Sequence, residues 1–419
     1  MDKLIIKGGK PLLGEVTVSG SKNATLPIMA SALLATGEHV IHGAPHLRDV
    51  RTMAKLLEYI GADVEWNDHI VVRTSRFGAM EAPYDLVKTM RASILVLGPL
   101  VGQLRRARVS LPGGCAIGAR PIDLHLKALE AMGAKVELND GYVEVFARHL
   151  HGADITFDKV TVTGTENIMM AAVQADGTTT LSNSAREPEV ADLAAHLCAM
   201  GACIEGAGTD RIVIHGVDKL KAVPHTIIPD RIEAGTLLIA AGITGGELLI
   251  RNFPSVMLET LVARLKETGM SIAVDGDAVR ARGAGRLKGQ NVTTAPHPGF
   301  ATDLQAQFMA LMSVADGTSI ISETIFENRF MHVPELSRMG AEISLDGGTA
   351  VVKGVARLKG APVMATDLRA SASLVLAGLA AEGQTEVLRV YHLDRGYERI
   401  EEKLAACGAD IKRVSEEDS

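Results

Sequence analysis

The sequence predicts an α/β protein made of six copies of one unit of about 70 residues, and three recurring signatures carry this prediction. The first is a short amphipathic helix that ends at glycine and precedes a strand, as in Leu56–Gly61 and Leu129–Gly133. A glycine just past a helix typically takes the left-handed cap conformation, and a regular period indicates a repeat architecture. The closing glycines are spaced by 68 to 72 residues and stand at positions 61, 133, 201, 269, 340 and 408.

The other two signatures define the rest of the unit. A turn glycine lies 23 to 25 residues before the closing glycine, after a helix and before a β-branched strand, except in the second copy, which has Arg105–Arg106 there. A Gly-x-x-x-Leu-x-Gly pattern follows a strand at 283–289 and 354–360, and again at 8–14. Each copy therefore reads strand–helix–strand–helix–strand–strand and is too small to bury its own faces, so the copies must pack together.

The last copy is interrupted. It stops after a strand at 409–414, before its own Gly-x-x-x-Leu-x-Gly pattern, and residues 3–20 have the missing half. We therefore expect the two termini to meet and the N-terminal strands to belong to the C-terminal half of the chain.

Composition limits the classes of function. Hydrophobic residues make up 47% and charged residues 22%, which is typical of a globular protein, and the net charge of −7 argues against nucleic-acid binding by bulk electrostatics. No apolar run is long enough to span a membrane and no signal peptide is apparent, so we expect a cytoplasmic protein without a membrane partner. The four cysteines and thirteen histidines lack metal-ligand spacing, and no phosphate-binding or dinucleotide glycine loop occurs. We expect neither a metal nor a cofactor.

One cysteine stands apart from the others. Cys115 lies in the glycine- and proline-rich stretch 112–121, five residues before Arg120. A guanidinium nearby favours the reactive thiolate, whereas the alternative is a small apolar side chain under a surface loop. The glycines and Arg120 favour a catalytic thiol on a lid that closes over an anionic substrate.

Charged residues recur where a strand passes into an apolar helix. They form the pairs Lys22–Asn23, Asp230–Arg231, Thr302–Asp303 and Asp367–Arg369. Helix capping is an equal alternative for Asp230, but cations at helix N-termini are better explained as receptors for a shared anion. The run Arg-Ala-Ser begins at Arg91 in the second copy and at Arg369 in the sixth, which indicates two half-sites in two domains with a cleft between them.

These residues carry a resemblance that spans about residues 1–414. The runs 19–23, 88–93 and 365–371, with the Pro-Gly-Gly-Cys loop and Arg120–Leu124, resemble the bacterial UDP-N-acetylglucosamine enolpyruvyl transferases. The resemblance implies an inside-out α/β barrel of two domains, each with three repeats, helices inside and sheets outside. It implies one domain at 22–229 and a second made of 1–21 and 230–419, with the active site in the cleft.

The resemblance also implies an activity. It is the transfer of the enolpyruvyl group of phosphoenolpyruvate to the sugar 3-hydroxyl of UDP-N-acetylglucosamine, with release of phosphate, by addition and then elimination. This is the first committed step of peptidoglycan precursor synthesis. The chemistry needs an acid, a base and cations for the substrate anions.

Roles follow by matching motifs. Cys115 is the implied proton donor and the site of a covalent phosphoenolpyruvate or epoxide adduct, Asp303 is the base, and Lys22 shares in catalysis. The residues implied for phosphoenolpyruvate are Lys22, Asn23, Arg120, Arg369 and Arg395. Those implied for the nucleotide sugar are Asn23, Arg91, Arg120, Pro121, Ile122, Asp123, Leu124, Lys159, Val160, Thr161, Val162, Asp303 and Ile325. The chain departs from the family at 162–167, where it has Val-Thr-Gly-Thr-Glu-Asn.

Two other functions remain open from the residues. One is enolpyruvyl transfer to shikimate 3-phosphate, which the cysteine loop and the run Arg120–Leu124 argue against. The other is a non-catalytic α/β repeat scaffold that binds a partner. The sequence leaves the oligomeric state open.

Overall fold

The structure is a computed structural model that describes residues 2–75, 81–88, 90–111, 122–283 and 285–415. Contacts divide these residues into two compact units: unit 1 contains the described parts of 1–19 and 229–419, and unit 2 those of 20–115 and 120–228. Each unit has its own apolar core. No helix within the described residues is both long and apolar enough to cross a membrane.

Six four-stranded sheets share one topology, which confirms the predicted repeat. In every sheet the first strand is parallel to the second, and the second and fourth are both antiparallel to the third. In unit 2 the sheets are β14(His225–Thr226)-β3(Gly37–His42)-β5(Ile70–Thr74)-β4(Asp63–Trp66), β6(Glu81–Ala82)-β7(Arg106–Ser110)-β9(Tyr142–Phe146)-β8(Lys135–Asn139) and β10(Asp154–Thr156)-β11(Thr178–Ser182)-β13(Arg211–His215)-β12(Cys203–Glu205). In unit 1 they are β2(Leu13–Thr17)-β15(Glu247–Arg251)-β17(Ala278–Arg282)-β16(Ser271–Asp275), β18(Val292–Thr293)-β19(Thr318–Ser322)-β21(Thr349–Lys353)-β20(Glu342–Asp346) and β22(Pro362–Met364)-β23(Gln384–Leu388)-β1(Lys3–Lys7)-β24(Asp410–Val414).

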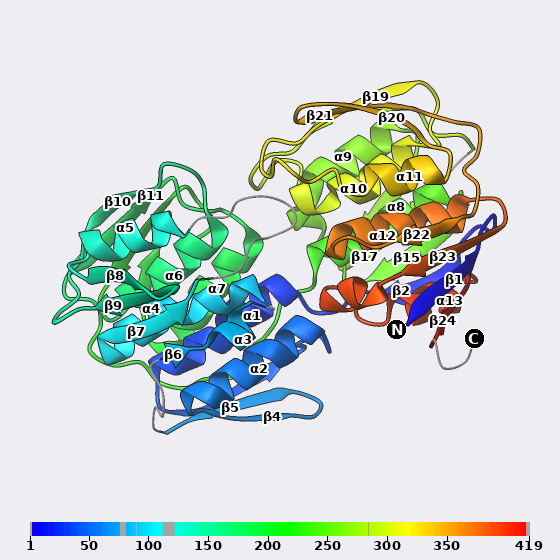
Figure 1. Ribbon diagram of the computed structural model, residues 1–419. Helices are drawn as coiled ribbons and strands as arrows, with labels where there is room; N and C mark the ends of the chain where they lie inside the picture. The colour runs from blue at the N-terminus through cyan, green and yellow to red at the C-terminus, as the bar shows by residue number, and fades with distance from the viewer. Residues whose placement is uncertain (1, 76–80, 89, 112–121, 284, 416–419) are drawn as a thin grey trace. The chain divides into compact units, whose positions relative to one another are not determined.

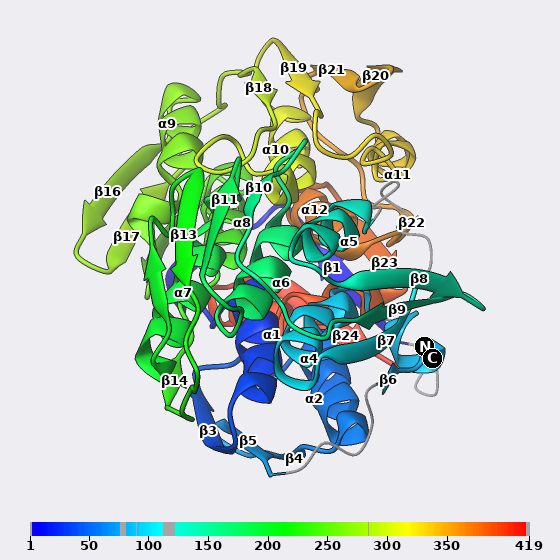
Figure 2. The same ribbon diagram turned by 90° about the vertical axis from the view of Figure 1, so that its left-hand side faces the viewer.

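Each repeat has one helix in the interior of its unit. These helices are mostly apolar and buried on all sides, and all thirteen residues of α8 are buried, with Arg231 and Glu233 among them. Figure 2 shows α1, α4 and α6 grouped inside unit 2. The interior helices are α1(Lys22–Ser31) with η1(Ala32–Leu34), η2(Arg91–Val96) with α4(Leu97–Leu104), and α6(Val162–Ala172) in unit 2, and α8(Arg231–Ile243), η4(Thr302–Leu304) with α10(Gln305–Met312), and α12(Leu368–Ala380) in unit 1.

The second helix of each repeat follows the interior helix in the sequence, covers the sheet of that repeat and ends near a closing glycine. All six closing glycines have positive φ, as the cap position requires. These helices are α2(Arg48–Ile60), α5(Asp123–Ala131), α7(Pro188–Met200), η3(Ser255–Met257) with α9(Glu259–Glu267), α11(Val333–Arg338), and η5(Val390–Arg395) with α13(Ile400–Ala406). One short extra helix, α3, spans Tyr84–Val87.

The N-terminal strands complete two sheets of unit 1. Strand β1 lies between β23 and β24 and is antiparallel to both, so the termini meet as the interrupted repeat predicts (Figure 1). Strand β2 does not join that sheet but pairs in parallel with β15 of the fourth repeat. In unit 2, β14 occupies the corresponding edge position beside β3.

The second repeat replaces its turn glycine by an arginine. Arg105 has a φ of 59°, in the left-handed region, and caps α4 through its backbone N–H. Its Nη2 donates to the backbone oxygen of Gln174 at 3.2 Å, at the end of a neighbouring interior helix. Glycine adopts a positive φ without steric cost, whereas arginine does not. The contact with Gln174 offsets this cost in the second repeat.

Candidate active site

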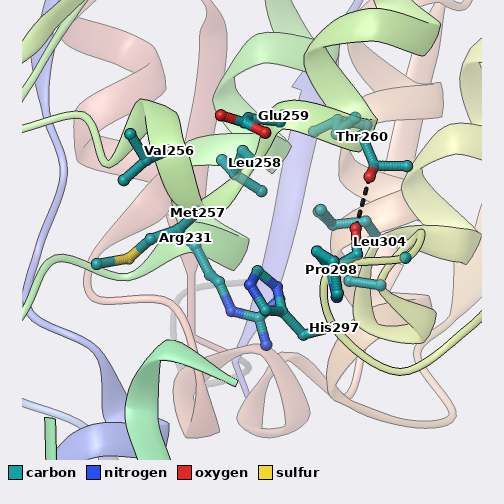
Figure 3. A pocket seen from close by; sticks show the side chains of 12 residues that line it. Arg231, Val256, Met257, Leu258, Glu259, Thr260, His297, Pro298 and Leu304 are labelled. Atoms are coloured by element: carbon teal, nitrogen blue, oxygen red, sulfur yellow. Dashed lines mark hydrogen bonds between the residues drawn. The ribbon is translucent and has the colours of Figure 1, made fainter. Parts of the chain in front are cut away.

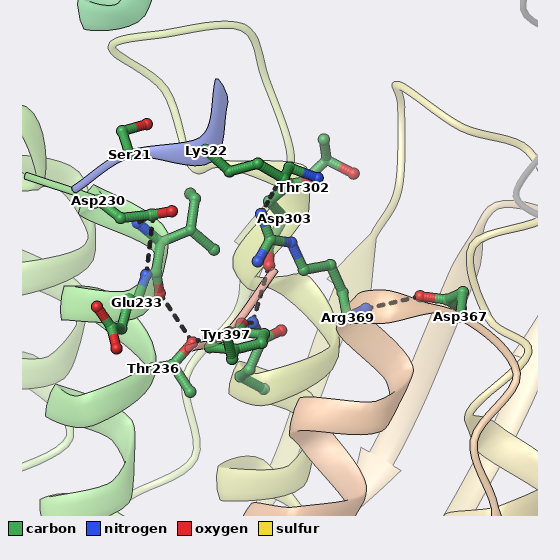
Figure 4. A network of polar contacts seen from close by, with 12 residues as sticks. Ser21, Lys22, Asp230, Glu233, Thr236, Thr302, Asp303, Asp367, Arg369 and Tyr397 are labelled. Atoms are coloured by element: carbon green, nitrogen blue, oxygen red, sulfur yellow. Dashed lines mark hydrogen bonds and ion pairs between the residues drawn. The ribbon is translucent and has the colours of Figure 1, made fainter. Parts of the chain in front are cut away.

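Unit 1 holds a carboxylate between two arginines, and Figure 4 shows the carboxylate residue, Asp303, beside one of them, Arg369. Asp303 lies in η4, and Arg329 Nη2 is 2.6 Å from its Oδ1 while Arg369 Nη2 is 2.9 Å from its Oδ2. The side chains of Arg329 and Arg369 are 6% and 3% exposed, whereas that of Asp303 is 26% exposed. The carboxylate is therefore the accessible member of a charge-assisted network whose cations are buried.

The arginines determine the charge of Asp303. Burial alone would raise the pKa of Asp303, but the charges and hydrogen bonds of Arg369 and Arg329 outweigh it and hold that pKa well below its ordinary value. Burial, the largest single effect, would lower the pKa of Arg369, but Asp303, Tyr397 and Asp230 together outweigh it and raise that pKa. At neutral pH the site therefore contains an ionised carboxylate and two guanidinium cations.

Two hydrogen-bond donors of Arg369 are not used by the contact with Asp303. Its Nε and Nη1 are buried and have no hydrogen-bond partner among the residues that the structure describes. A buried donor without a partner costs about 1–3 kcal/mol, and more for a charged group. An anionic ligand that accepts from these two nitrogens would remove that cost.

A second carboxylate organises the loop beside Arg329. Thr302 Oγ1 accepts from Arg329 Nη1 at 2.9 Å and donates to Glu323 Oε2 at 2.8 Å. Glu323 Oε1 accepts from the backbone N–H groups of Ile325 and Phe326 at 2.8 and 3.1 Å. The half-buried Ile325, a predicted sugar-nucleotide residue, is thus held in the same network as Asp303.

The strand-to-helix turns contain both caps and cations. Asp230 Oδ1 accepts from the N–H groups of Ile232 and Glu233, and Asp367 Oδ1 accepts from those of Arg369 and Ala370. Both aspartates are therefore N-caps, the alternative left open for Asp230. Arg369 follows its cap, and its side chain binds Asp303 instead of the helix end.

Unit 2 places its predicted residues at the N-terminal ends of its helices. Lys22 is the first residue of α1, behind the N-cap Ser21, and its Nζ lies 3.4 Å from Asp49 Oδ2. Asn23 follows it and is half-buried. Arg91 begins η2, Asp123 begins α5 with Ile122 and Leu124 beside it, and Lys159–Val162 lead into α6.

His125 links three of these helix ends. Its Nε2 lies 3.1 Å from Thr163 Oγ1 of α6. Burial first, and then the charge of Arg91, lower the pKa of His125 to about 4, so the ring is neutral. The starts of η2, α5 and α6 are therefore close together in unit 2. Thr163, where the chain departs from the family pattern, makes this contact.

Some predicted residues lie outside the described part of the chain. These are Cys115, Arg120 and Pro121, together with the predicted lid at 112–121. Arg395 ends η5 in unit 1 and is half-buried.

The other three cysteines differ from expectation. From their places in the repeats, Cys198, Cys203 and Cys407 are all predicted to be packed. Cys407 is buried, and burial raises the pKa of its thiol. The prediction is wrong for Cys198 and Cys203, which are exposed, because Cys198 lies on the outer face of α7 and Cys203 lies in the edge strand β12.

Asp303, Arg329 and Arg369 line neither of two cavities. One in unit 1, of about 30 Å³, is lined by residues that include Arg231 and His297 and holds little more than a water molecule (Figure 3). One in unit 2, of about 680 Å³, lies at the carboxyl ends of the interior helices beside Arg105, Gln174 and Lys219. Of the predicted substrate residues that are described, none lines either cavity. No cluster of three or more potential metal ligands occurs among the residues described.

Sequence reasoning missed four residues of the unit 1 network. They are Arg329, Glu323, Gln307 and Tyr397. Arg329 lies in an irregular segment with no repeat signature, Gln307 lies in an apolar run that indicates core, and Tyr397 lies in a polar segment that carries no signature. The only sequence signal was the charge of Arg329 in the same repeat as Asp303.

Comparisons with known proteins agree over the whole chain. The family described as EPSP synthase (3-phosphoshikimate 1-carboxyvinyltransferase) matches residues 6–404. The chain is 62% identical over 418 residues to a UDP-N-acetylglucosamine 1-carboxyvinyltransferase of Myxococcus xanthus, and 61% identical over 417 residues to one of Geotalea uraniireducens. These alignments cover 99% of this chain and 99% and 100% of the relatives.

Solved structures share the fold. The enolpyruvyl transferase NikO of Streptomyces tendae is 28% identical with a TM-score of 0.88, over 99% of both chains. An EPSP synthase of Acinetobacter baumannii is 16% identical with a TM-score of 0.76, over 99% of this chain and 100% of that one, which shows the fold alone. The inside-out two-domain α/β fold is thereby confirmed. With the match over 6–404 and full-length relatives above 60% identity, the chain belongs to the EPSP synthase family and, within it, to the UDP-N-acetylglucosamine 1-carboxyvinyltransferases.

Proposed function

We propose that this protein transfers the enolpyruvyl group of phosphoenolpyruvate to the 3-hydroxyl of UDP-N-acetylglucosamine and releases phosphate, in peptidoglycan precursor synthesis. Relatives about 60% identical over nearly the whole chain carry the name of this activity. The observation that carries the chemistry is Asp303 held by two buried arginines, one of which has two donor nitrogens to spare.

Phosphoenolpyruvate has a carboxylate and a phosphate, so its binding site needs several cations. In unit 1 the buried Arg369 supplies Nε and Nη1 for an anion, and Arg395 adds a second guanidinium. In unit 2 Lys22 and Asn23 begin α1, where the helix dipole also favours negative charge. Arg120 completes the proposed set.

The reaction runs in two steps. In the addition, the sugar O3 forms a bond to C2 of phosphoenolpyruvate, the O3 proton goes to the Asp303 carboxylate, and a proton from the Cys115 thiol adds to C3, which becomes a methyl group. In the elimination, that methyl group returns a proton to the Cys115 thiolate, the C2–C3 double bond re-forms, and the C2–O bond to the phosphate breaks. Inorganic phosphate leaves with the proton that Asp303 had taken from the sugar. Arginine and lysine charges stabilise the negative charge that develops on the leaving group.

The nucleotide sugar would be held mainly by unit 2. Its proposed contacts are Arg91, Ile122 to Leu124 with Arg120 and Pro121, and Lys159 to Val162, with Asn23, and with Asp303 and Ile325 from unit 1. The meeting of η2, α5 and α6 around His125 supports this grouping. We also propose that units 1 and 2 are the two functional domains, and that the protein acts in the cytoplasm.

Phosphate release from the purified protein tests this function. We expect release to require both phosphoenolpyruvate and UDP-N-acetylglucosamine, with neither substrate sufficient alone. Release with shikimate 3-phosphate in place of the nucleotide sugar would assign the other acceptor. Absence of turnover with both acceptors, from protein that is folded by circular dichroism, would favour the non-catalytic scaffold.

A further inference from the structure

A polar junction lies beneath Asp303 and its two arginines in unit 1, where the interior helices α8, α10 and α12 meet. Tyr397, just after η5, is 2% exposed, and its hydroxyl lies 2.9 Å from both Thr236 Oγ1 of α8 and Gln307 Nε2 of α10. Its ring centroid is 5.3 Å from Arg369 Cζ of α12, within cation–π range. Figure 4 shows Tyr397 among these residues. One side chain therefore contacts a residue from each interior helix.

The hydrogen bonds of this junction have a definite direction. Thr236 Oγ1 uses its single proton on the backbone oxygen of Ile232, 2.8 Å away. Tyr397 must therefore donate to Thr236 and accept from the amide of Gln307. Gln307 Nε2 also lies 2.9 Å from the backbone oxygen of Asp303 and 3.2 Å from Thr236 Oγ1, so its two protons are shared among three acceptors. The chain of bonds thus runs from the backbone of α8, through the Tyr397 hydroxyl, to the backbone of the candidate base.

Close packing fixes the backbone on both sides of the tyrosine–arginine contact. A Cβ atom on Gly396 would lie 2.5 Å from Leu368 Cδ1, so the turn before Tyr397 packs directly on the first residue of α12. The N-cap bond from Arg369 N to Asp367 Oδ1, at 2.8 Å, fixes the other side. The ring and the guanidinium therefore meet with little freedom to separate.

We propose that Tyr397 is a positioning residue: its ring orients Arg369 and its hydroxyl, through Gln307, orients Asp303. In this arrangement Arg369 Nη2 stays on the carboxylate, and Nε and Nη1, which have no partner among the described residues, would be available to the anionic substrate. The inference rests on the proposed function and adds to it a residue, Tyr397, that fixes the side-chain positions of Arg369 and Asp303 in the phosphoenolpyruvate site. Without its contact with Tyr397, the Arg369 side chain would turn so that Nε and Nη1 form hydrogen bonds elsewhere.

The test compares Tyr397→Phe with Tyr391→Phe in the full-length protein. The first variant keeps the ring and removes the hydroxyl. The second removes a hydroxyl from the same segment, where the Tyr391 and His392 rings are tilted by 36° with centroids 4.3 Å apart. We expect Tyr397→Phe to raise the KM for phosphoenolpyruvate by about three- to tenfold, the scale of one or two lost hydrogen bonds. The KM for UDP-N-acetylglucosamine should change little, and Tyr391→Phe should match wild type.

The pH profile gives a second readout. The charged groups that act on Asp303 are Arg369 and Arg329, and Asp230 and Tyr397 act on Arg369 in turn. Tyr397→Phe removes the hydroxyl that orders Asp303 through Gln307, and Arg369 Nη2 is anchored on Asp303, so the ion pair between them should loosen. Arg369 would then depress the pKa of Asp303 less, and the acidic limb of kcat/KM should move to higher pH. A purely structural tyrosine would lower the Tm and the active fraction without moving this limb or the KM for phosphoenolpyruvate.

The outcomes separate this inference from the proposed function. Tyr397→Phe with the KM values and acidic limb of Tyr391→Phe, in an active wild-type background, would overturn the positioning role alone. An inactive wild-type protein would overturn the proposed function instead. If Tyr397→Phe fails to fold, Thr236→Val removes the acceptor of the tyrosine proton and should shift the same two parameters in the same direction.

Discussion

A carboxylate between two guanidinium groups is a stable ion pair but a weak base, and Asp303 is held in this way. Its pKa is depressed by Arg369 and Arg329 although burial opposes the effect. A substrate anion that accepts from Arg369 would share that positive charge and return proton affinity to the carboxylate. We therefore expect Asp303 to become an effective base only when phosphoenolpyruvate is bound.

Asp303→Asn tests this residue directly. The amide can accept from one arginine but presents N–H groups to the other, and it cannot take a proton from the sugar hydroxyl. We expect turnover to fall by at least about two orders of magnitude, the usual scale for a general base. Phosphate release measures the loss, with the exposed Asp346→Asn, in the β20–β21 hairpin, as the matched control. Near-normal turnover in Asp303→Asn would remove this residue from the mechanism.

Exposure alone does not identify a reactive cysteine, because Cys198 and Cys203 are exposed. The property proposed for Cys115 is reactivity toward anionic reagents, which Arg120 would confer. We therefore expect a small anionic epoxide to modify Cys115 and inactivate the protein, whereas a neutral alkylating reagent also modifies Cys198 and Cys203. Peptide mass spectrometry locates the adducts.

Two variants serve as controls for the alkylation. Cys115→Asp should retain measurable transferase activity, since a carboxyl group can still donate a proton, and lose its sensitivity to the epoxide. The double variant Cys198→Ser/Cys203→Ser should remain fully sensitive. An epoxide adduct on Cys198 or Cys203, with Cys115 unmodified, would refute the assignment.

At the scale of elements, the repeat was predictable because each helix and strand carries its own local signals. The closing glycines and apolar helices predict every unit, and the interrupted last copy predicts β1 in the sixth sheet. The position of β2 was not predictable, because an edge strand is defined by its partner and not by its own pattern. Both β2 and β14 pair within the unit that the chain is about to leave.

The central position of β1 has a measurable consequence. Leu4 and Ile6 are fully buried between β23 and β24, whereas Ile5 points to the opposite, half-exposed face. Leu4→Ala should lower the free energy of unfolding by about 2–5 kcal/mol, the range for a buried leucine, although it lies four residues from the N-terminus. Urea denaturation measures this, with Ile5→Ala as the control. Equal effects of the two substitutions would contradict the place of β1 in the core.

The site was less predictable than the fold. Lys22, Asp303 and Arg369 follow from charges at repeated strand-to-helix turns. Glu323, Arg329, Gln307 and Tyr397 do not, because their roles depend on hydrogen bonds between segments that are distant in sequence, which no local pattern encodes. The bonds of Glu323 and Arg329 join segments of one repeat. Those of Gln307 and Tyr397 arise only when the interior helices of different repeats pack together.

At the scale of the whole molecule, buried histidines predict sensitivity to acid. Burial, the largest cause in each case, lowers the pKa of His125 and His332 to about 4 and that of His196 to about 3. These groups are neutral when folded but take up protons below about pH 6.5 when unfolded. The unfolded state thus binds more protons between the two pKa values, so the free energy of unfolding falls as the pH falls through this window.

His196→Leu isolates one of these contributions. Neither ring nitrogen of His196 has a hydrogen-bond partner among the described residues, so the substitution leaves no donor or acceptor unpaired. Between pH 7 and pH 5 the wild type should lose about 2 kcal/mol more than the variant. Denaturation at both pH values measures the slope, with the exposed His149→Gln as control. An unchanged slope in His196→Leu would show that this ring is not kept neutral by the fold.

The central claim is enolpyruvyl transfer to the sugar by addition and elimination, and analysis of the product formed in D₂O tests it most directly. The addition step should place a solvent deuteron on C3 of the transferred group, and the elimination should retain part of that label. We expect NMR and mass spectrometry to show UDP-N-acetylglucosamine joined at O3 to an enolpyruvyl group whose methylene carries deuterium, with one phosphate released per product. An unlabelled enolpyruvyl product would contradict the addition–elimination route, and a failure to form any O3-linked product would contradict the function itself.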